Sequence, residues 1–191
     1  MHREDLDGER IFLLHDFLSP DECRRYIADS EGLGYDDAPI STSAGFVMRK
    51  DVRNNERVMT DDIALAATLF ERARPLLVPA WFRWELAGLN ERFRFYRYDP
   101  GQYFAPHADG YFERHWAERS QFTFMVYLND DFKGGETCFE RHSTPLVVRP
   151  KTGMALVFYH HQVHEGAAVI EGRKYVLRTD VMYRRKIEAS V

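Results

Sequence analysis

Two side chains in one short polar stretch could bind a metal ion. Residues 104–116 read FAPHADGYFERHW, which places His107 and Asp109 two positions apart. In an extended segment, residues two apart project from the same face, so both side chains could reach one ion. The pair alone is a weak signal, because a polar surface turn gives the same pattern. A third ligand has to come from elsewhere in the chain.

The segment FYHHQVHEG offers three candidates, His160, His161 and His164. The first and third have the spacing of the zinc-protease helix motif, but His161 stands where that motif needs its glutamate base. The flanking MALVFY and GAAVI also indicate strands. One of these histidines, joined to His107 and Asp109, would instead give two histidines and one carboxylate. That set occupies one face of an octahedron and leaves three positions open, as non-haem Fe(II) oxygenases require.

Strands are expected to hold these residues. From residue 92 onward, apolar and aromatic residues alternate with polar ones in segments such as RFRFYRY, QFTFMVYLN and KYVLRTDVMYR. Glycine and proline separate these segments. About eight short strands without an intervening helix predict an antiparallel sandwich or barrel.

Helices are expected in the first part of the chain. Ser19 and Glu22 form a capping-box pattern ahead of one helix. A second helix is predicted to begin after a cap at Thr60 and to end at Pro75. The polar run at residues 49–58, RKDVRNNERV, is typical of a solvated loop, with part of a substrate lid as the alternative.

Composition narrows the class of protein. The chain has 191 residues, of which 45% are hydrophobic, enough for one globular domain. Its net charge of −4 predicts no nucleic-acid partner. Cys23 and Cys138 fit reduced thiols, and the acidic N-terminus lacks the apolar core of a signal peptide. No apolar run is long enough to span a bilayer, so a cytoplasmic protein without membrane contact is expected. Nothing in the sequence predicts the oligomeric state.

Several segments in order resemble a known family. They are YRYDPGQYFAPHADGYF, FTFMVYLNDDFKGGETCF and PKTGMALVFYHHQVHEGAAVIEGRKY. Together they resemble the Fe(II)/2-oxoglutarate-dependent oxygenases, most closely the prolyl 4-hydroxylase-like branch. The resemblance implies a mainly β fold, a double-stranded β-helix (a jelly-roll or cupin-like barrel) with N-terminal helices packed on it. Residues 1–191 would form a single domain, with a helical support region at 1–91 and the catalytic core at 92–183.

The resemblance also implies roles for individual residues. His107, Asp109 and His164 become the catalytic iron ligands; His164 is preferred because it stands ten residues before Lys174. Lys174 becomes the partner of the C5 carboxylate of 2-oxoglutarate. His160 and His161 become flanking residues, of which at most one touches the pocket. The family pattern places three further residues near the cosubstrate, namely Tyr98, Thr123 and Tyr127.

Alternation along two strands refines these roles. In FTFMVYLN, Thr123 and Tyr127 share one face and the apolar residues share the other. Arg178 lies on the same strand face as Lys174, about 13 Å away along the strand. A guanidinium suits a carboxylate, so Arg178 is a further candidate for cofactor binding. Two other roles are open for Arg178: a contact with the substrate, or an ion pair with an acidic residue of the barrel.

The implied activity is hydroxylation of an unactivated C–H bond. Fe(II), 2-oxoglutarate and O2 would be required, with ascorbate as an optional addition, and 2-oxoglutarate would be converted to succinate and CO2. Asp109 favours hydroxylation, since related halogenases carry a small residue at this position. The expected substrate is a prolyl or other residue of a peptide or protein. A free amino acid or small metabolite is the alternative, and a silent metal-binding barrel acting as a sensor or scaffold is a third.

Overall fold

Antiparallel strands form most of the chain. The computed structural model describes residues 1–42, 45–141 and 144–186. Eight strands of the main sheet follow in spatial order: β1 (His2–Asp5), β2 (Ile11–His15), β16 (Ala155–Tyr159), β12 (Glu118–Tyr127), β19 (Lys174–Arg185), β9 (Arg92–Tyr98), β6 (Glu56–Asp61) and β3 (Asp36–Asp37). In the same sheet, β8 (Trp84–Leu89) pairs with β19 and with β7 (Ala80–Trp81), and β11 (Glu113–His115) pairs with β12.

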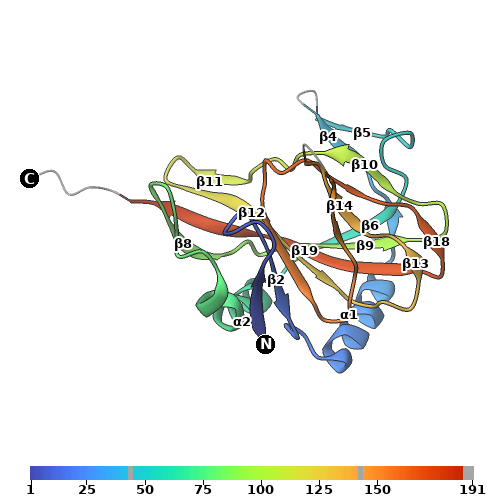
Figure 1. Ribbon diagram of the computed structural model, residues 1–191, viewed down its shortest axis with the longest axis horizontal. Helices are drawn as coiled ribbons and strands as arrows, with labels where there is room; N and C mark the ends of the chain where they lie inside the picture. Colours follow the sequence, from blue (N-terminus) through green and yellow to red (C-terminus); the bar gives the residue numbers. More distant parts are fainter. Residues whose placement is uncertain (43–44, 142–143, 187–191) are drawn as a thin grey trace, which may run out of the picture.

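A smaller sheet faces one side of the main sheet (Figure 1). Phe139 on the smaller sheet packs edge-on against Phe158 on the main sheet, with ring centroids 5.1 Å apart. The buried side chains between the two sheets form one core cluster. The smaller sheet consists, in spatial order, of β10 (Phe104–His107), β17 (His164–Gly166), β14 (Thr137–Phe139) and β15 (Leu146–Val148). Two ribbons complete the β structure: β4 (Ile40–Thr42) with β5 (Gly45–Val47), and β13 (Lys133–Gly134) with β18 (Val169–Glu171).

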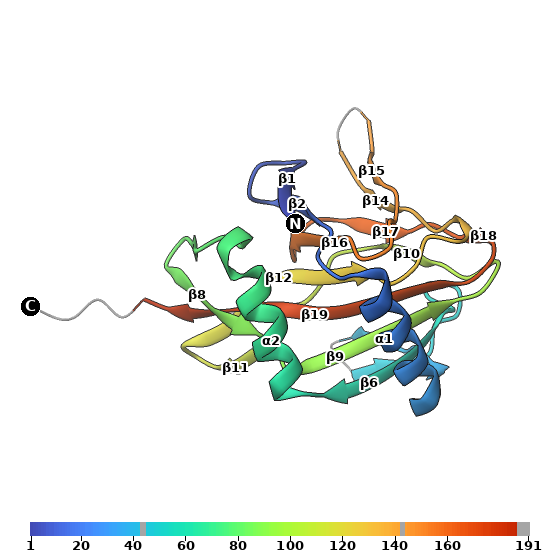
Figure 2. The same cartoon turned by 90° about the horizontal axis from the view of Figure 1, so that it is seen from below.

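Two helices, α1 (Pro20–Leu33) and α2 (Ile63–Ala73), cover the opposite face of the main sheet (Figure 2). The predicted cap of α1 is confirmed: the Ser19 hydroxyl accepts from the Glu22 N–H, and the Glu22 carboxylate accepts from the Ser19 N–H. These reciprocal bonds satisfy two N–H groups that the first turn leaves without a partner. The helices bury their apolar side chains against the sheet in a second core cluster.

The predicted cap of α2 at Thr60 is wrong. Thr60 lies within β6, where it pairs with Phe93, and α2 begins after Asp62. The Asp62 side chain accepts a hydrogen bond of 2.8 Å from the Leu65 N–H. A carboxylate also suits the positive end of the helix dipole, which a neutral threonine does not complement. A short 3₁₀ turn, η1 (Arg74–Leu76), follows α2 directly.

Residues 1–91 are not only a helical support. Besides the two helices, this region supplies β1, β2, β3, β6, β7 and β8 to the main sheet. Strand β2 pairs with β16, β6 with β9, and β8 with β19, so the first part of the chain extends the sheet formed by the second. The described residues contain no helix that is both long and apolar enough to cross a membrane.

Alternation along β12 is as predicted. Phe122, Phe124 and Val126 belong to the core beneath the helices, whereas Tyr127 belongs to the core between the sheets. Thr123 lies on the same face as Tyr127 and lines a pocket there. Because successive residues of a strand point to opposite faces, one strand serves both the core and the interior of the barrel.

Candidate active site

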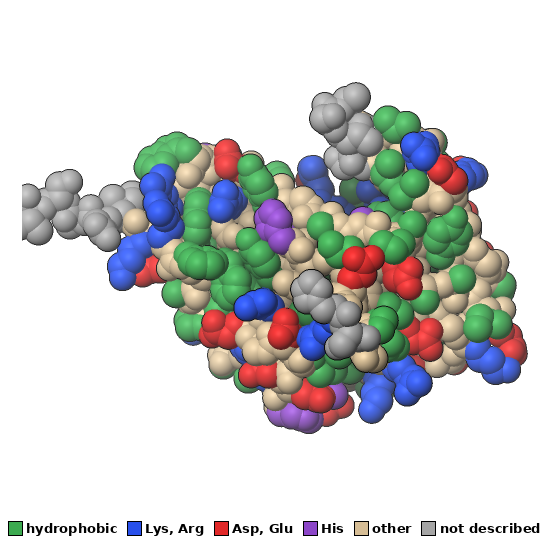
Figure 3. All heavy atoms as spheres, turned by 45° about the horizontal axis from the view of Figure 1, so that its top comes forward, with side chains coloured by type: hydrophobic (Ala, Val, Ile, Leu, Met, Phe, Trp, Pro, Cys, Tyr) green, Lys and Arg blue, Asp and Glu red, His purple; other side chains and the backbone are tan. Residues whose placement is uncertain are grey.

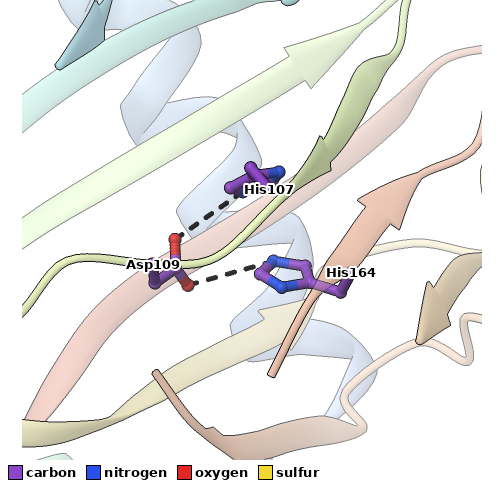
Figure 4. A group of neighbouring side chains, drawn as sticks. All are labelled: His107, Asp109 and His164. Carbon is purple, nitrogen blue, oxygen red and sulfur yellow. Dashed lines mark ion pairs between the residues drawn. The ribbon is translucent and has the colours of Figure 1, made fainter. Parts of the chain in front are cut away.

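Three side chains meet where β10 and β17 pair. His107 ends β10 and His164 begins β17, and the two residues stand opposite each other in the strand register. Asp109 follows β10 by two residues, and one ligand atom from each of the three side chains lies within 4.8 Å of the others. Figure 4 shows both histidine rings facing the Asp109 carboxylate, with each carboxylate oxygen directed at one ring. His107 Nε2 is 3.7 Å from Asp109 Oδ1, and His164 Nε2 is 3.9 Å from Asp109 Oδ2.

Backbone carbonyls fix both imidazole rings. His107 Nδ1 lies 2.8 Å from the Ala105 carbonyl oxygen, and His164 Nδ1 lies 2.9 Å from the Gln162 carbonyl oxygen. A carbonyl only accepts, so each Nδ1 carries a proton, and in the neutral form of each ring Nε2 presents its lone pair toward Asp109. Burial lowers the pKa of His164 to about 4, which keeps this ring neutral near pH 7. Two neutral nitrogens and a carboxylate are the donor set that octahedral Fe(II) accepts.

The Asp109 carboxylate is held before any metal binds. Its Oδ2 accepts a 2.6 Å hydrogen bond from the Thr123 hydroxyl and lies 3.1 Å from Arg178 Nη2. Its backbone N–H donates to the His160 carbonyl at 2.9 Å. Burial opposes ionisation, but the positive charge of Arg178 holds the pKa of Asp109 well below its usual range. The side chain is therefore an anion of fixed orientation.

A chain of hydrogen bonds continues behind Asp109. Since Thr123 donates to Asp109, its oxygen accepts from His160 Nδ1 at 3.0 Å, and His160 Nε2 accepts from the Ser120 hydroxyl at 2.8 Å. Burial lowers the pKa of His160 to about 4, consistent with one proton on the ring. His161 is exposed. Of these two neighbours, only His160 contributes a side chain to the site.

A buried ammonium lies at the far end of the same pocket. Lys174 is 3% exposed, and its Nζ donates to the Gly135 carbonyl at 2.6 Å. It lies 5.2 Å from the ring centroid of Tyr98 and 5.5 Å from that of Tyr127. Among the described residues, no carboxylate forms an ion pair with it. Burial without a counter-ion lowers the pKa of Lys174 to about 8.

The pocket joins this lysine to the metal-binding group. Tyr98, Thr123 and Arg178 line it, as does Thr137, a residue the sequence analysis did not single out. The Tyr127 hydroxyl lies 2.7 Å from Thr137 Oγ1, so Tyr127 supports the pocket wall from behind. Thr137 ends the GGET turn, and alternation from that turn could have identified it.

Arg178 does not reach the end of the pocket at which Lys174 lies. Its Nη2 lies 3.1 Å from the Asp109 carboxylate and 3.5 Å from the Asp180 carboxylate.

A second, wider cavity opens on the other side of the metal-binding group. Its volume is about 480 Å³, and it shares Tyr96, His107, Asp109 and Arg178 with the inner pocket. Arg53 also lines it, although residues 49–58 read as a solvated loop from sequence. The loop is exposed at residues 49–51, but Arg53 is buried in the cavity wall. No periodicity in the sequence indicated this, because residues 49–55 belong to no strand.

Comparisons with known proteins agree with this geometry. The sequence model described as 2OG-Fe(II) oxygenase superfamily matches residues 93–179. Prolyl 4-hydroxylase 1 of Arabidopsis thaliana is 27% identical, over 87% of this chain and 66% of its own length. A putative prolyl 4-hydroxylase of Acanthamoeba polyphaga mimivirus is 26% identical, over 86% of this chain and 71% of its length. The chain thus spans about two thirds of the length of these curated relatives.

Solved structures share the architecture. A viral collagen prolyl hydroxylase from Paramecium Bursaria Chlorella virus-1, solved with 2OG, superposes with a TM-score of 0.65 at 22% identity, covering 95% of this chain and 99% of its own. A prolyl hydroxylase from Trichoplax adhaerens, solved with a hypoxia inducible factor peptide fragment, superposes with a TM-score of 0.69 at 14% identity, covering 95% and 86%. The predicted mainly β fold, a double-stranded β-helix with helices packed on it, is confirmed.

Proposed function

We propose that this chain, a prolyl 4-hydroxylase-like member of the 2OG-Fe(II) oxygenases that matches the superfamily over residues 93–179, hydroxylates an unactivated C–H bond using Fe(II), 2-oxoglutarate and O2. One observation carries the proposal. His107, Asp109 and His164 offer two imidazole nitrogens and an ionised carboxylate within 4.8 Å of one another, in a pocket that ends at Lys174, whose ammonium has no ion-pair partner among the described residues. A metal dication and a dicarboxylate each find the opposite charge there.

The side chains bind and orient the reactants. When bound, Fe(II) would supply the oxidising chemistry by reacting with O2 and 2-oxoglutarate, and 2-oxoglutarate would be converted to succinate and CO2. His107, Asp109 and His164 hold the metal, and Thr123 and Arg178 fix the carboxylate that faces it. Lys174 binds the C5 carboxylate of the cosubstrate, with Tyr98 and Tyr127 beside it. The apolar walls around Met125, Phe158 and Val176 keep water from the reaction.

The shape of the outer cavity supports a peptide substrate. A free amino acid would suit a closed pocket, whereas the cavity of about 480 Å³ beside His107 and Asp109 opens to solvent. We therefore favour a residue within a peptide or protein, and a prolyl residue by analogy with the curated relatives. The catalytically silent alternative leaves the buried, unpaired Lys174 without a role.

Anaerobic titration with Fe(II) and 2-oxoglutarate tests the proposal. A visible charge-transfer band should appear in the wild-type protein and should be absent from His107→Ala and His164→Ala. His161→Ala is the matched control, because this exposed histidine lies three residues from His164 and outside the donor set. Wild-type protein without a band would refute the proposed cofactor chemistry. Succinate formation with peptide and with free-proline substrates would then separate the two substrate classes.

Two wider proposals accompany this one. Residues 1–191 work as a single domain, because β2, β6 and β8 from the first part of the chain pair with strands of the catalytic part. The protein works in a reducing compartment such as the cytoplasm, which suits the free thiols of Cys23 and Cys138.

A further inference from the structure

Positive charge lines the wide cavity beside the metal-binding group. Its wall contains five arginines and two aspartates, so the lining is cationic although the whole chain has a net charge of −4. Lysine and arginine side chains (blue) are visible in the hollow of the surface in Figure 3. Three of the arginines have carboxylate partners within 3.2 Å: Arg92 with Asp61, Arg94 with Asp180, and Arg178 with Asp109.

The other two arginines of the cavity wall, Arg53 and Arg57, differ from these three. Among the described residues, no carboxylate pairs with Arg53 or Arg57. Arg53 is 4% exposed; its Nε donates to Asn55 at 2.7 Å, and its Nη2 makes no hydrogen bond within the described chain. Burial of a charged donor without a partner destabilises the free protein, so a ligand that pairs with this donor would recover that free energy.

Aromatic rings hold the Arg53 guanidinium in place. Its central carbon lies 4.5 Å from the ring centroids of both Tyr96 and Phe104, and the two rings also line the cavity. A guanidinium fixed between rings has already lost much of its rotational freedom, and less is lost when it binds a ligand. Arg53 is thus a preorganised donor at the cavity wall.

The Tyr96 phenol reports the local excess of positive charge. Burial would raise its pKa, but the nearby charges of four arginines lower it to about 8. These are Arg178, Arg53, Arg94 and Arg57. An anion is therefore stabilised at this position of the cavity.

We propose that the cavity, beside the site of oxidation, binds the carboxylate side chain of an acidic residue in the peptide substrate. The assignment rests on the proposed hydroxylase function and narrows its substrate to acidic peptides. Arg53 and Arg57 are the carboxylate-binding residues, because their charges are not already paired within the described chain. The planar fork of arginine matches a carboxylate with two hydrogen bonds.

A peptide fits the outer cavity better than 2-oxoglutarate does. The distal carboxylate of 2-oxoglutarate has a separate cation in Lys174, which lines the inner pocket and not the outer cavity. The outer cavity also extends past Met59 and Tyr111, both exposed, to the surface. An extended peptide can run along such an opening while one acidic side chain reaches the arginines.

The test compares two series of proline-centred peptides, one flanked by Asp or Glu and the other by Asn or Gln. Binding of labelled peptide to the anaerobic Fe(II)–2-oxoglutarate enzyme is followed by fluorescence anisotropy. We expect the acidic series to bind about tenfold tighter or more at low salt, because charge-assisted hydrogen bonds to arginine replace neutral ones. Added salt should reduce this advantage.

Charge reversal at Arg57 tests whether the preference for acidic peptides arises in this cavity. Arg57→Glu should remove the preference for acidic peptides, whereas Arg25→Glu, on the exposed face of α1 away from the cavity, should retain it. Arg57→Gln should give an intermediate result. Each variant must first form the wild-type charge-transfer band, which shows that the metal and cosubstrate sites are intact.

Several outcomes would overturn the inference and leave the hydroxylase function standing. They are equal binding of the two series, a preference that survives Arg57→Glu, and binding of neither series by protein that forms the band. Loss of 2-oxoglutarate affinity in Arg57→Glu with an unchanged peptide preference would assign the arginine to the cosubstrate instead. Absence of the band in wild-type protein would count against the proposed function itself.

Discussion

Replacement of Lys174 by methionine should weaken 2-oxoglutarate binding strongly. The side chain is buried, its Nζ donates to one backbone carbonyl, and no carboxylate of the described residues neutralises it. Methionine keeps much of the volume but offers no charge, so the distal carboxylate of the cosubstrate would be buried without a partner. Removing one member of a buried ion pair typically costs about 3 kcal/mol or more, which corresponds to a roughly 150-fold rise in Kd.

The affinity should also depend on pH in a defined direction. Burial lowers the pKa of Lys174 to about 8 in the free protein, so the side chain is charged below that pH and neutral above it. Binding a carboxylate above pH 8 requires uptake of a proton, and the affinity should therefore fall as the pH rises past 8. The methionine variant should lack this dependence.

Anaerobic titration of the Fe(II)-loaded protein, followed by the visible band, measures both effects. Lys133→Met is the matched control, because Lys133 lies on the exposed ribbon strand β13 and pairs with Glu171. The reasoning would be refuted if Lys174→Met bound 2-oxoglutarate as the wild type does. It would also be refuted if Arg178→Met lost more affinity than Lys174→Met, because Arg178 would then be the cosubstrate-binding residue.

Two further predictions concern the support of the site and of the fold. Thr123→Val removes the 2.6 Å hydrogen bond to Asp109 and should weaken Fe(II) binding about 10- to 100-fold with the fold retained. Thr123→Ser keeps the hydroxyl and should bind Fe(II) as the wild type does, so equal Fe(II) affinity in all three proteins would contradict a positioning role. Hydrogen bonding with Arg72 lowers the pKa of Glu22 from 4.5 to about 2, so this contact stabilises the fold above pH 4.5 and is lost as the pH falls toward 2. Because solvent screens this partly exposed pair, Glu22→Gln, which can still accept the Ser19 N–H, should lower the free energy of unfolding by about 1 kcal/mol at pH 7 and by much less near pH 2. Urea unfolding at both pH values measures this, and an equal loss at both would indicate an uncharged cause.

Local sequence patterns predicted the elements that depend on near neighbours. The capping box at Ser19 and Glu22 and the alternation around Thr123 and Tyr127 appear in the structure as expected, because each rests on contacts a few residues apart. The same reasoning misplaced the cap of α2, since Thr60 and Asp62 are both acceptable caps and only the pairing of β6 with β9 decides between them.

The site depended on contacts that only the fold could supply. A histidine–x–aspartate pair and a later histidine could be found in the sequence, and the pairing of β10 with β17 brings them together. By contrast, nothing in the sequence indicated that Arg53, from a charged loop, would be buried between Tyr96 and Phe104. Residues far apart in the chain make these contacts, so neither periodicity nor spacing could reveal them.

The long strand β19 limits how this protein can change in evolution or in the laboratory. Lys174 and Arg178 point into the barrel, while Tyr175, Leu177 and Val181 belong to the core under the helices. Inserting or deleting one residue near the start of the strand would exchange the two sets, exposing apolar side chains to the cavity and burying charges in the core. New substrate specificities should therefore arise here by substitution, whereas changes of length should be confined to the connecting loops.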